Sequence, residues 1–546
     1  MKHPLYYGKL SALSSALLSI SSSIFAADTN TTPPSAEPAV QTLPTLSFQA
    51  SAEPQKQKDD DISAVPKTVI TRDEMLQYGD QSVMDALRRA AGFQLPTPGQ
   101  GPRGGGGASG MRFRGGAGPT FLINGEPVQG GPRGGMSIID TITPEMIERI
   151  EIVKQPSVAQ ASVASSAVIN IILKEPLDNR ISGSVKVGYG LRSSQQQESE
   201  NKQINIQADG RDNAWSYSVS ANQMWVDNTS LTKTETATGT REQARTVNRT
   251  MQMFAPRLQY DLDDQQKLIA ELFYRNIKMD GYSANQTQDD KNDSIRLNTR
   301  YERKDKDLSD KIRLSVERQT ETQLTRSLQN TIYTDETINE YGLAYDGMRK
   351  LDPDRQIKFG VDARSNNLDS NVSDSLDEQR YALYAEGSWR FTDRQTITLG
   401  ARQEWLNRSG LVDYQDQHLS PVLAYRFDLT EQWSIQTNLS QAFNSPKTDR
   451  LIPNVTVSTD SDAGSLNNPD RGGNPNLKPE KTRAAESTLA YDSASGGVNL
   501  TAYHREIKDY IEKVIALEGS RYVERPQNQN EATTYGVELS GRYALK

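Results

Sequence analysis

A two-residue alternation of apolar and polar side chains recurs from residue 181 to the end of the chain and limits the possible folds most strongly. Clear examples are Val185/Val187/Tyr189, Trp215/Tyr217/Val219, Leu268/Ala270/Leu272/Tyr274 and Tyr381/Leu383/Ala385. Short polar turns, such as residues 263–266 and 352–355, alternate with long polar stretches. Long alternating strands with short turns at one end and long connections at the other are typical of a transmembrane β-barrel. A soluble β-sandwich or propeller would have shorter strands and more even connections.

The long polar stretches are predicted to be loops at one end of this barrel. They are residues 227–249, 321–339, 365–379 and 444–478. Counting the alternating segments between turns gives about 16 strands. Because a bilayer offers no partner to an unpaired strand edge, we expect the sheet to close on itself.

The N-terminus has the order of a secretory signal peptide. Lys2 and Lys9 precede an uncharged, moderately apolar stretch over residues 10–25, and Ala26 and Ala27 follow it. We predict a signal peptide over residues 1–26 with cleavage near Ala26. A short N-terminal anchor helix is the alternative. No later stretch reaches 18 uncharged apolar residues, so the sequence predicts no transmembrane helix.

Residues 27–67 are rich in Pro, Thr, Ser, Ala and Gln and are predicted to be a disordered linker. Residues 43–50 interrupt it with a short, Pro-flanked, β-prone segment. Such a segment is suited to adding a strand to the sheet edge of a partner, although an ordinary apolar interruption of a linker is an equal alternative.

Residues 68–178 are predicted to form a small mixed α/β domain. Strands are expected over residues 67–70, 120–123, 149–154 and 168–173. Thr71 or Asp73 is a suitable cap for one helix, Ser82 for a second over residues 83–90, and Thr143 for a short helix over residues 144–147. Asn124-Gly125 is a hairpin turn signal.

Composition excludes several kinds of site. The chain has no Cys, so thiolate metal sites, thiol nucleophiles and disulfides are excluded. Its three histidines are His3, His418 and His504, and they lack the spacing of a metal site. We therefore predict no enzymatic activity, no cofactor and no metal centre. The net charge of −8 argues against a nucleic-acid partner, despite Arg-Gly-Gly triplets at Arg103, Arg114 and Arg133.

Several segments, taken together and in order, resemble a TonB-dependent outer-membrane receptor, with a plug domain and a β-barrel. The segments that carry the resemblance are VIT at 69–71, SVMDAL at 82–87, MRFRG at 111–115, FLINGEP at 121–127, IERIEIVK at 147–154, VINIILK at 168–174, NPNLKPE at 474–480 and TYGVE at 534–538. The resemblance covers nearly the whole chain after the signal peptide.

The resemblance implies a 22-stranded barrel of the bacterial outer membrane that contains the plug. It implies TonB-coupled import of a scarce nutrient, most often a ferric siderophore or similar metal chelate. The implied partners are TonB, this small ligand, outer-membrane lipid and the barrel-assembly machinery. A passive outer-membrane pore or a surface adhesin is the alternative function.

The resemblance also implies two sets of site residues. TonB would pair with a box formed by Thr45, Leu46, Ser47, Phe48, Gln49 and Ala50. Charged contacts between plug and barrel would be made by Arg112, Arg114, Glu148, Arg149 and Glu151. The ligand-binding residues are not identified by these motifs.

The chain departs from the family pattern in two places. Gln155-Pro156-Ser157 stands where a Gly-rich turn is usual, and residues 158–167 after it are mostly Ala, Ser and Val. TYGVE at 534–538 usually has about six strands after it, and barrels of this kind usually end on an aromatic residue rather than on Lys546. We therefore expect residues 179–546 to form an incomplete barrel and the sequence to be truncated at its C-terminus. A shortened barrel is the alternative.

Overall fold

The structure is a computed structural model of all 546 residues. It describes residues 62, 64–65, 67–80, 82–94, 111–114, 118–128, 139, 142–154, 158, 167–174, 181–194, 197–236, 239–284, 286–327, 331–446, 450–455, 464–467, 469–493 and 495–543. The predicted signal peptide, the linker segment at residues 43–50 and the Arg-Gly-Gly triplets at Arg103 and Arg133 lie outside these residues.

The N-terminal domain, residues 62–174, has a five-stranded mixed sheet with the order β1-β6-β7-β4-β5. Its elements are β1 (Thr68–Thr71), α2 (Arg72–Tyr78), α3 (Val83–Arg88), β2 (Phe93–Gln94), β3 (Arg112–Phe113), β4 (Thr120–Ile123), β5 (Glu126–Pro127), the 3-10 helix η4 (Pro144–Met146), β6 (Ile147–Val153) and β7 (Val168–Leu173). Thr71 and Ser82 cap α2 and α3 through their side chains, as the sequence predicts. Thr143 precedes η4 without a side-chain cap.

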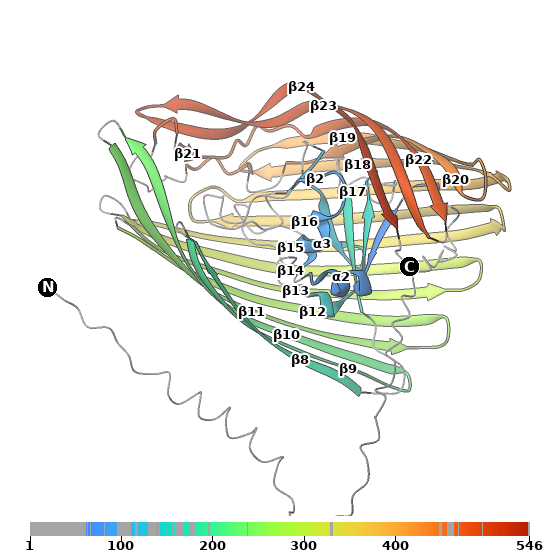
Figure 1. Ribbon diagram of the computed structural model, residues 1–546. Coiled ribbons are helices and arrows are strands. Elements are labelled where there is room, and N and C mark those ends of the chain that lie inside the picture. Colours follow the sequence, from blue (N-terminus) through green and yellow to red (C-terminus); the bar gives the residue numbers. More distant parts are fainter. Residues whose placement is uncertain are drawn as a thin grey trace, which may run out of the picture. The chain divides into compact units, whose positions relative to one another are not determined.

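The remainder forms a barrel of long antiparallel strands, which Figure 1 shows side by side in colours that run from green at β8 to red at β24. The strands are β8 (Ile181–Ser193), β9 (Gln197–Asp212), β10 (Trp215–Thr236), β11 (Gly239–Asp261), β12 (Gln266–Ser283), β13 (Gln286–Lys304), β14 (Leu308–Ser327), β15 (Thr331–Asp352), β16 (Arg355–Ser370), β17 (Leu376–Thr392), β18 (Gln395–Gly410), β19 (Tyr414–Asp428), β20 (Trp433–Asn444), β21 (Asp470–Arg471), β22 (Glu480–Ser493), β23 (Gly496–Glu518) and β24 (Arg521–Tyr543). The predicted fold class, a small α/β domain with a large antiparallel barrel, is confirmed.

Ladders of paired residues join the long strands in sequence from β8 to β24, with β20 paired directly to β22. The strand order returns from β24 to β8. A short parallel ladder also joins β21 to β24, with Asp470 opposite Val523. Outward side chains on β8 are more exposed than those of the middle strands, for example 70% for Val185 against 54% for Leu343 on β15.

The two faces of the barrel differ in composition because side chains alternate along each strand. Large apolar side chains such as Leu314, Leu343 and Leu383 point outward. Buried charged and amide side chains such as Glu317, Arg402 and Asn438 point inward. Within the described residues, no helix has the length and apolar composition needed to cross a bilayer.

Three of the long polar stretches are strands rather than the predicted loops. The β10–β11 ladder continues through residues 227–236 and 239–249, and strands β14–β17 likewise occupy most of residues 321–339 and 365–379. A ladder is held by backbone hydrogen bonds, so it continues where both faces become polar and the apolar alternation ends. The alternation therefore marks only part of each strand.

The fourth stretch, residues 444–478, is mainly a connection between β20 and β22. Its described part packs Leu451, Ile452 and Leu477 against inward-facing Ile338 and Leu368 of the barrel. Arg525 donates hydrogen bonds to the carbonyls of Pro453 and Gly473, both at 2.6 Å. This connection is therefore fixed to the inner wall by both apolar packing and hydrogen bonds.

Candidate functional site: two charged clusters between the N-terminal domain and the barrel

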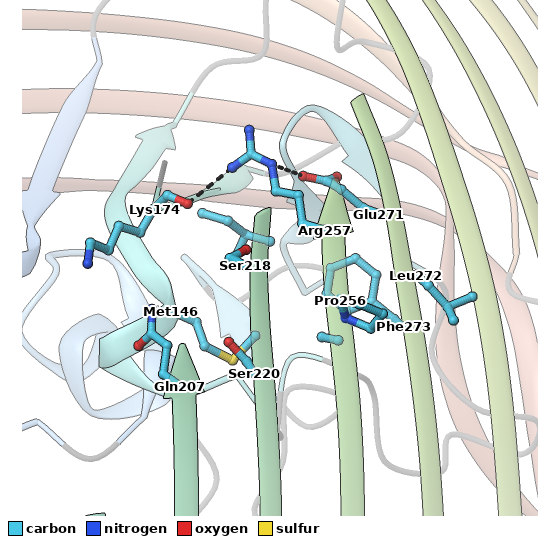
Figure 2. A pocket seen from close by; sticks show the side chains of 12 residues that line it. Met146, Lys174, Gln207, Ser218, Ser220, Pro256, Arg257, Glu271, Leu272 and Phe273 are labelled. Atoms are coloured by element: carbon cyan, nitrogen blue, oxygen red, sulfur yellow. Dashed lines mark hydrogen bonds and ion pairs between the residues drawn. The ribbon is translucent and has the colours of Figure 1, made fainter. Parts of the chain in front are cut away.

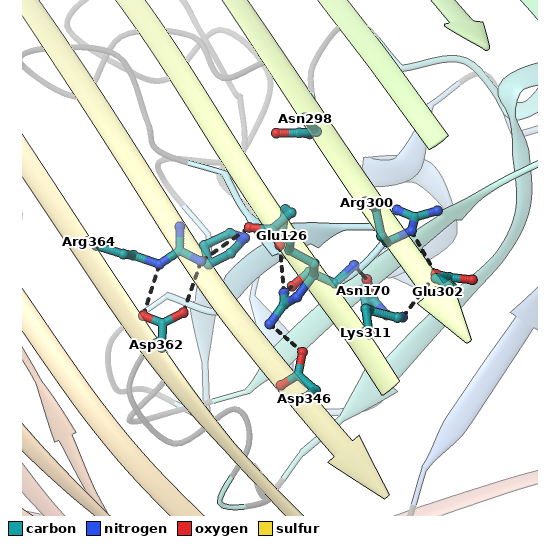
Figure 3. Close-up of polar contacts among 12 residues, drawn as sticks. Glu126, Asn170, Asn298, Arg300, Glu302, Lys311, Asp346, Asp362 and Arg364 are labelled. Carbon is teal, nitrogen blue, oxygen red and sulfur yellow. Dashed lines mark hydrogen bonds and ion pairs between the residues drawn. The ribbon is translucent and has the colours of Figure 1, made fainter. Parts of the chain in front are cut away.

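The hairpin turn between β4 and β5 contacts the barrel more extensively than its length suggests. Asn124 and Gly125 have positive φ values of 50° and 87°, which a tight two-residue turn requires. This turn presents the carboxylate of Glu126 to the inner wall, as Figure 3 shows. We call residues 124–127 and their barrel partners the turn cluster.

Glu126 forms ion pairs with two arginines on different barrel strands. Its carboxylate lies 2.7 Å from Arg313 Nη1 on β14 and 3.2 Å from Arg364 Nη2 on β16. Burial of Glu126 opposes ionisation, but the two guanidinium groups outweigh it and hold the pKa of this carboxyl below its usual value. Glu126 is therefore charged at neutral pH although it is buried.

Backbone and amide groups of the same turn complete the turn cluster. Arg313 and Arg296 each donate a 2.7 Å hydrogen bond to a turn carbonyl, those of Gly125 and Pro127 respectively. Asn124 Nδ2 donates to Glu271 on β12 at 2.8 Å, and its Oδ1 accepts from the backbone N–H of Leu173 at 3.0 Å. The turn thus contacts β12, β13, β14 and β16.

A second cluster, the Arg114 cluster, joins the N-terminal domain to β22 and β24. Arg114 Nη1 lies 2.5 Å from Glu486, and its Nε and Nη2 donate to Glu538 at 2.8 and 3.0 Å. Lys154 Nζ donates to Glu538 at 2.8 Å. The guanidinium of Arg114 also lies 4.1 Å from the ring centre of Tyr503 on β23. Two cations of the domain therefore face two carboxylates of the barrel.

Gly92 allows this close approach. It has φ +93°, and an added Cβ would lie 2.7 Å from Glu538 Oε1 and 2.8 Å from the ring of Phe113. Its carbonyl accepts a hydrogen bond from Arg114 N at 2.8 Å, which positions the arginine. Gly92 thus has a role in the Arg114 cluster.

Removing one partner from a buried ion pair leaves an uncompensated charge, which costs about 3–5 kcal/mol. A pair whose two members both become hydrated as they part leaves no uncompensated buried charge. The two clusters can therefore hold the domain in one position and still separate reversibly when a force acts on it.

The structure places the five predicted contact residues differently. Arg114 alone among them reaches the barrel. Arg149 pairs with Glu151 at 2.8 Å, and Glu151 also pairs with Lys67 at 3.0 Å, all within the N-terminal domain. Arg112 and Glu148 are exposed on β3 and β6. The predicted TonB-binding residues Thr45, Leu46, Ser47, Phe48, Gln49 and Ala50 lie outside the described residues.

Sequence reasoning missed most of the residues in the two clusters: Glu126, Lys154, Arg296, Arg313, Arg364, Glu486 and Glu538. Glu126 carried a signal, because a charged residue directly after an Asn-Gly turn is held in a fixed direction. Glu538 lies in the late-barrel segment at 534–538 that carries the family resemblance, and Glu486 lies six residues after the segment at 474–480. Their partner Arg114 is more than 370 residues away from both.

The two histidines of the barrel are packed separately. His418 is buried on β19, where its ring stacks on Phe443 at 5.2 Å, and His504 on β23 stacks on Tyr535 at 6.5 Å. Among the described residues, no group of three or more His, Cys, Asp or Glu side chains is arranged to hold a metal ion.

Two family models match the chain. The TonB-dependent receptor plug domain matches residues 61–168, and the TonB-dependent receptor-like β-barrel matches residues 188–546. Curated relatives include an iron-regulated outer membrane virulence protein of Vibrio cholerae, 24% identical over 233 residues, which are 41% of this chain. The match spans about a third, 32%, of the length of that relative.

Solved structures with the same fold include three outer-membrane proteins. The ferric enterobactin receptor PfeA of Pseudomonas aeruginosa, in complex with enterobactin, has a TM-score of 0.68 at 17% identity, covering 88% of this chain and 78% of that one. The siderophore receptor PirA of Pseudomonas aeruginosa has a TM-score of 0.64 at 18% identity, covering 87% and 81%. The copper transporter OprC has a TM-score of 0.65 at 16% identity, covering 89% and 77%. At these identities the similarity concerns the fold.

The family models together with the fold settle the class and the location of the protein. The barrel model alone covers about two thirds of the chain. The plug model covers most of the N-terminal domain, including Arg114 and the turn between β4 and β5. The predicted location in the bacterial outer membrane is confirmed with the family. The chain belongs to the TonB-dependent receptors, with an N-terminal plug domain and a transmembrane β-barrel.

Proposed function

We propose that the protein imports a scarce nutrient across the outer membrane, driven by TonB, and that the nutrient is a ferric siderophore or similar metal chelate. Similar proteins named as ferric enterobactin and siderophore receptors, a copper transporter and iron-regulated outer-membrane proteins support this substrate class. TonB binds the segment at residues 45–50 and, in this proposal, pulls on the chain that leads into β1.

The observation that carries the proposal is how the plug is attached. Its contacts with the barrel include the buried ion pairs of the turn cluster and the Arg114 cluster, which can separate and re-form. A plug that only blocked a pore would be held as well by apolar packing, without buried charges. Lipid and the barrel-assembly machinery are further partners in this proposal.

Deleting residues 45–50 tests the coupling. Uptake of ⁵⁵Fe-enterobactin and of ⁶⁴Cu is measured in iron-limited cells that have no other receptor for the probe. We expect transport by the parent protein to be lost on deletion, with unchanged amounts of folded barrel in the outer membrane. Deleting residues 30–35 of the same linker is the matched control and leaves uptake intact.

Uptake that survives the deletion of residues 45–50 would contradict the proposal and support a passive pore. Absence of uptake for both probes in the parent protein would contradict the metal-chelate substrate class.

A further inference from the structure

The space between the plug and strands β10–β12 is small and is bridged by polar contacts. The cavity that Figure 2 shows there has a volume of about 30 Å³. Beside it, Arg257 Nε lies 3.3 Å from Glu271, and Arg257 Nη1 donates a 3.1 Å hydrogen bond to the carbonyl of Lys174. Because a single water molecule needs about 10–15 Å³, this cavity is too small for an organic ligand.

A much larger groove lies on the outer wall of the barrel, across strands β18, β19, β20, β22 and β23, which are neighbours in the barrel (Figure 1). Its volume is about 790 Å³. Strand register places the outward-facing Leu399, Leu423 and Leu439 in one row. The row continues with the small Ala485 and then with His504. Ala485 therefore leaves open space beside an apolar wall of leucines.

The groove crosses the lipid-facing wall obliquely. Leu399, at its apolar end, lies four residues from the short-turn end of β18, which is Gln395. Arg483 and Glu506, at its polar end, each lie ten residues from the short-turn ends of β22 and β23. Short turns mark the periplasmic end of an outer-membrane barrel. The apolar end is therefore deeper in the membrane, and the polar end is nearer the external surface.

Two belts of aromatic side chains show where the membrane interfaces lie. Trp433 and Tyr491, with ring centres 4.9 Å apart, are at the short-turn ends of β20 and β22. Trp405 is ten residues from the short-turn end of β18 and is 37% exposed. Such belts lie at both interfaces of a bilayer. Arg483, at the same distance along its strand as Trp405, is therefore at the external interface, whereas the leucines face hydrocarbon.

The external end of the groove has a cation without a protein counterion. Arg483 is exposed and lies opposite Gln441 on β20 and Glu506 on β23. Lys481, nearer the external surface, is 3.8 Å from Asp416, whereas Arg483 forms no ion pair within the described part of the chain. A guanidinium at an interface with anionic lipid is well placed to bind a phosphate group.

The other polar groups at this end indicate the rest of the headgroup. The carboxylate of Glu506 accepts hydrogen bonds and repels a second anion, so the part of the headgroup beside it has to carry hydroxyl or amide donors. Neighbouring strands lie about 4.8 Å apart, so the polar side chains on β20, β22 and β23 span about 10 Å. A sugar that carries a phosphate has both this width and these donors.

We propose that the groove is a binding site for a phosphorylated glycolipid of the outer leaflet. The phosphate binds Arg483, and the sugar donates hydrogen bonds to Glu506 and Gln441. The acyl chains lie over Ala485 and along the row of leucines. This binding is independent of the nutrient that the protein transports.

Two substitutions test the two ends of the site. Arg483→Ala removes the guanidinium, and Ala485→Phe fills the groove. Arg318→Ala is the control for the charge, since Arg318 is exposed and also lies ten residues from the short-turn end of its strand, β14. Ala385→Phe is the control for the added volume, at an exposed position on β17 outside the groove.

The full chain and the four variants are purified as folded barrels in a mild detergent. Lipid A with two phosphate groups is added, and the bound lipid is counted by native mass spectrometry. We expect Arg483→Ala and Ala485→Phe each to weaken binding about tenfold, because one loses a charged hydrogen bond and the other loses the space for acyl chains. The two control variants should bind lipid A as the parent protein does.

Three results would overturn the site. Equal binding by all five proteins, or no binding by the parent protein, would show that lipid A does not recognise the groove. Equal binding of lipid A that lacks both phosphates would contradict the role of Arg483. Displacement of lipid A by an equal concentration of phosphatidylglycerol or phosphatidylethanolamine would show a phospholipid site instead of a glycolipid site.

Discussion

Glu126 shows how one residue connects the plug to several strands. Its carboxylate is buried and faces Arg313 and Arg364, which come from strands separated by β15. Arg313 in turn pairs with Asp346 at 2.7 Å, so the charge of the turn cluster is distributed along the wall. Individual side chains, rather than broad surfaces, therefore determine how firmly the plug is seated.

Replacing Glu126 by Gln is expected to loosen the plug. The change keeps the shape and removes the charge that compensates two buried guanidinium groups, so the free energy of plug release should fall by about 3 kcal/mol. The measurement is the urea concentration at which the plug of the purified protein becomes sensitive to protease. Glu148→Gln, at an exposed position on β6, is the control and should change this free energy by less than about 0.5 kcal/mol. Equal effects of the two substitutions would contradict the role of Glu126.

Seating of the plug should also depend on pH in a specific direction. Burial alone would raise the pKa of Glu126 and Glu145, but their hydrogen bonds and cationic partners outweigh it, so both pKa values are lowered. A carboxyl group whose pKa is lower in the folded than in the unfolded protein stabilises the folded form at pH values above its pKa in the unfolded protein, about 4.3. This stabilisation is lost as the pH falls through the pKa of the group in the folded protein. The urea midpoint of plug release should therefore be nearly constant from pH 8 to pH 5 and fall below about pH 4. A fall already between pH 7 and pH 5 would show that other groups control plug release.

At the scale of the elements, the strands extend well beyond their apolar segments. The register of β10 and β11 continues to Thr236 and Gly239, past the point where the alternation stops. The alternation of apolar and polar residues reports which side chains contact lipid, so it ends where the strands leave the bilayer. The backbone hydrogen bonds of the ladder do not depend on contact with lipid, and the strands therefore continue into residues that the alternation places in loops. Helix positions in the plug were predicted more accurately, since the capping side chains of Thr71 and Ser82 act locally.

Hydrogen exchange distinguishes a strand from a loop in these extensions. We expect amides of residues 227–236 and 239–249 to exchange over minutes to hours, because the ladder protects them. The connection at residues 371–375 is an internal reference for fast exchange. Exchange of residues 227–236 at the rate of residues 371–375 would contradict the extended β10–β11 hairpin.

At the scale of the whole molecule, the plug and the barrel share one core. Plug residues such as Leu87 and Ile150 belong to the same buried cluster as Met253, Ala255 and Phe273 of the barrel. The buried charges of Arg114 and Glu126 find their partners on the barrel. The plug is therefore stabilised by the barrel, and the barrel lumen is closed by the plug.

Deleting residues 61–178 should open the lumen. Barrels of 16–18 strands leave an aqueous channel when nothing fills them, so the variant should show stable ion conductance in a planar bilayer. The parent protein and the variant that lacks residues 45–50 both keep the plug and should remain closed. Steady conductance of the parent protein would contradict this view and favour the passive pore.

The sequence by itself determined the class of fold, the capped helices of the plug and the family. These depend on local periodicity, local capping and short motifs, which act over a few residues. Only the tertiary structure decided that Arg114 faces Glu486 and Glu538, that Glu126 faces Arg313 and Arg364, and that Arg149 pairs within the plug. The barrel partners are far away in the sequence, 238 residues for Glu126 and Arg364 and 424 for Arg114 and Glu538. Strand register together with plug position decides which of these charges meet.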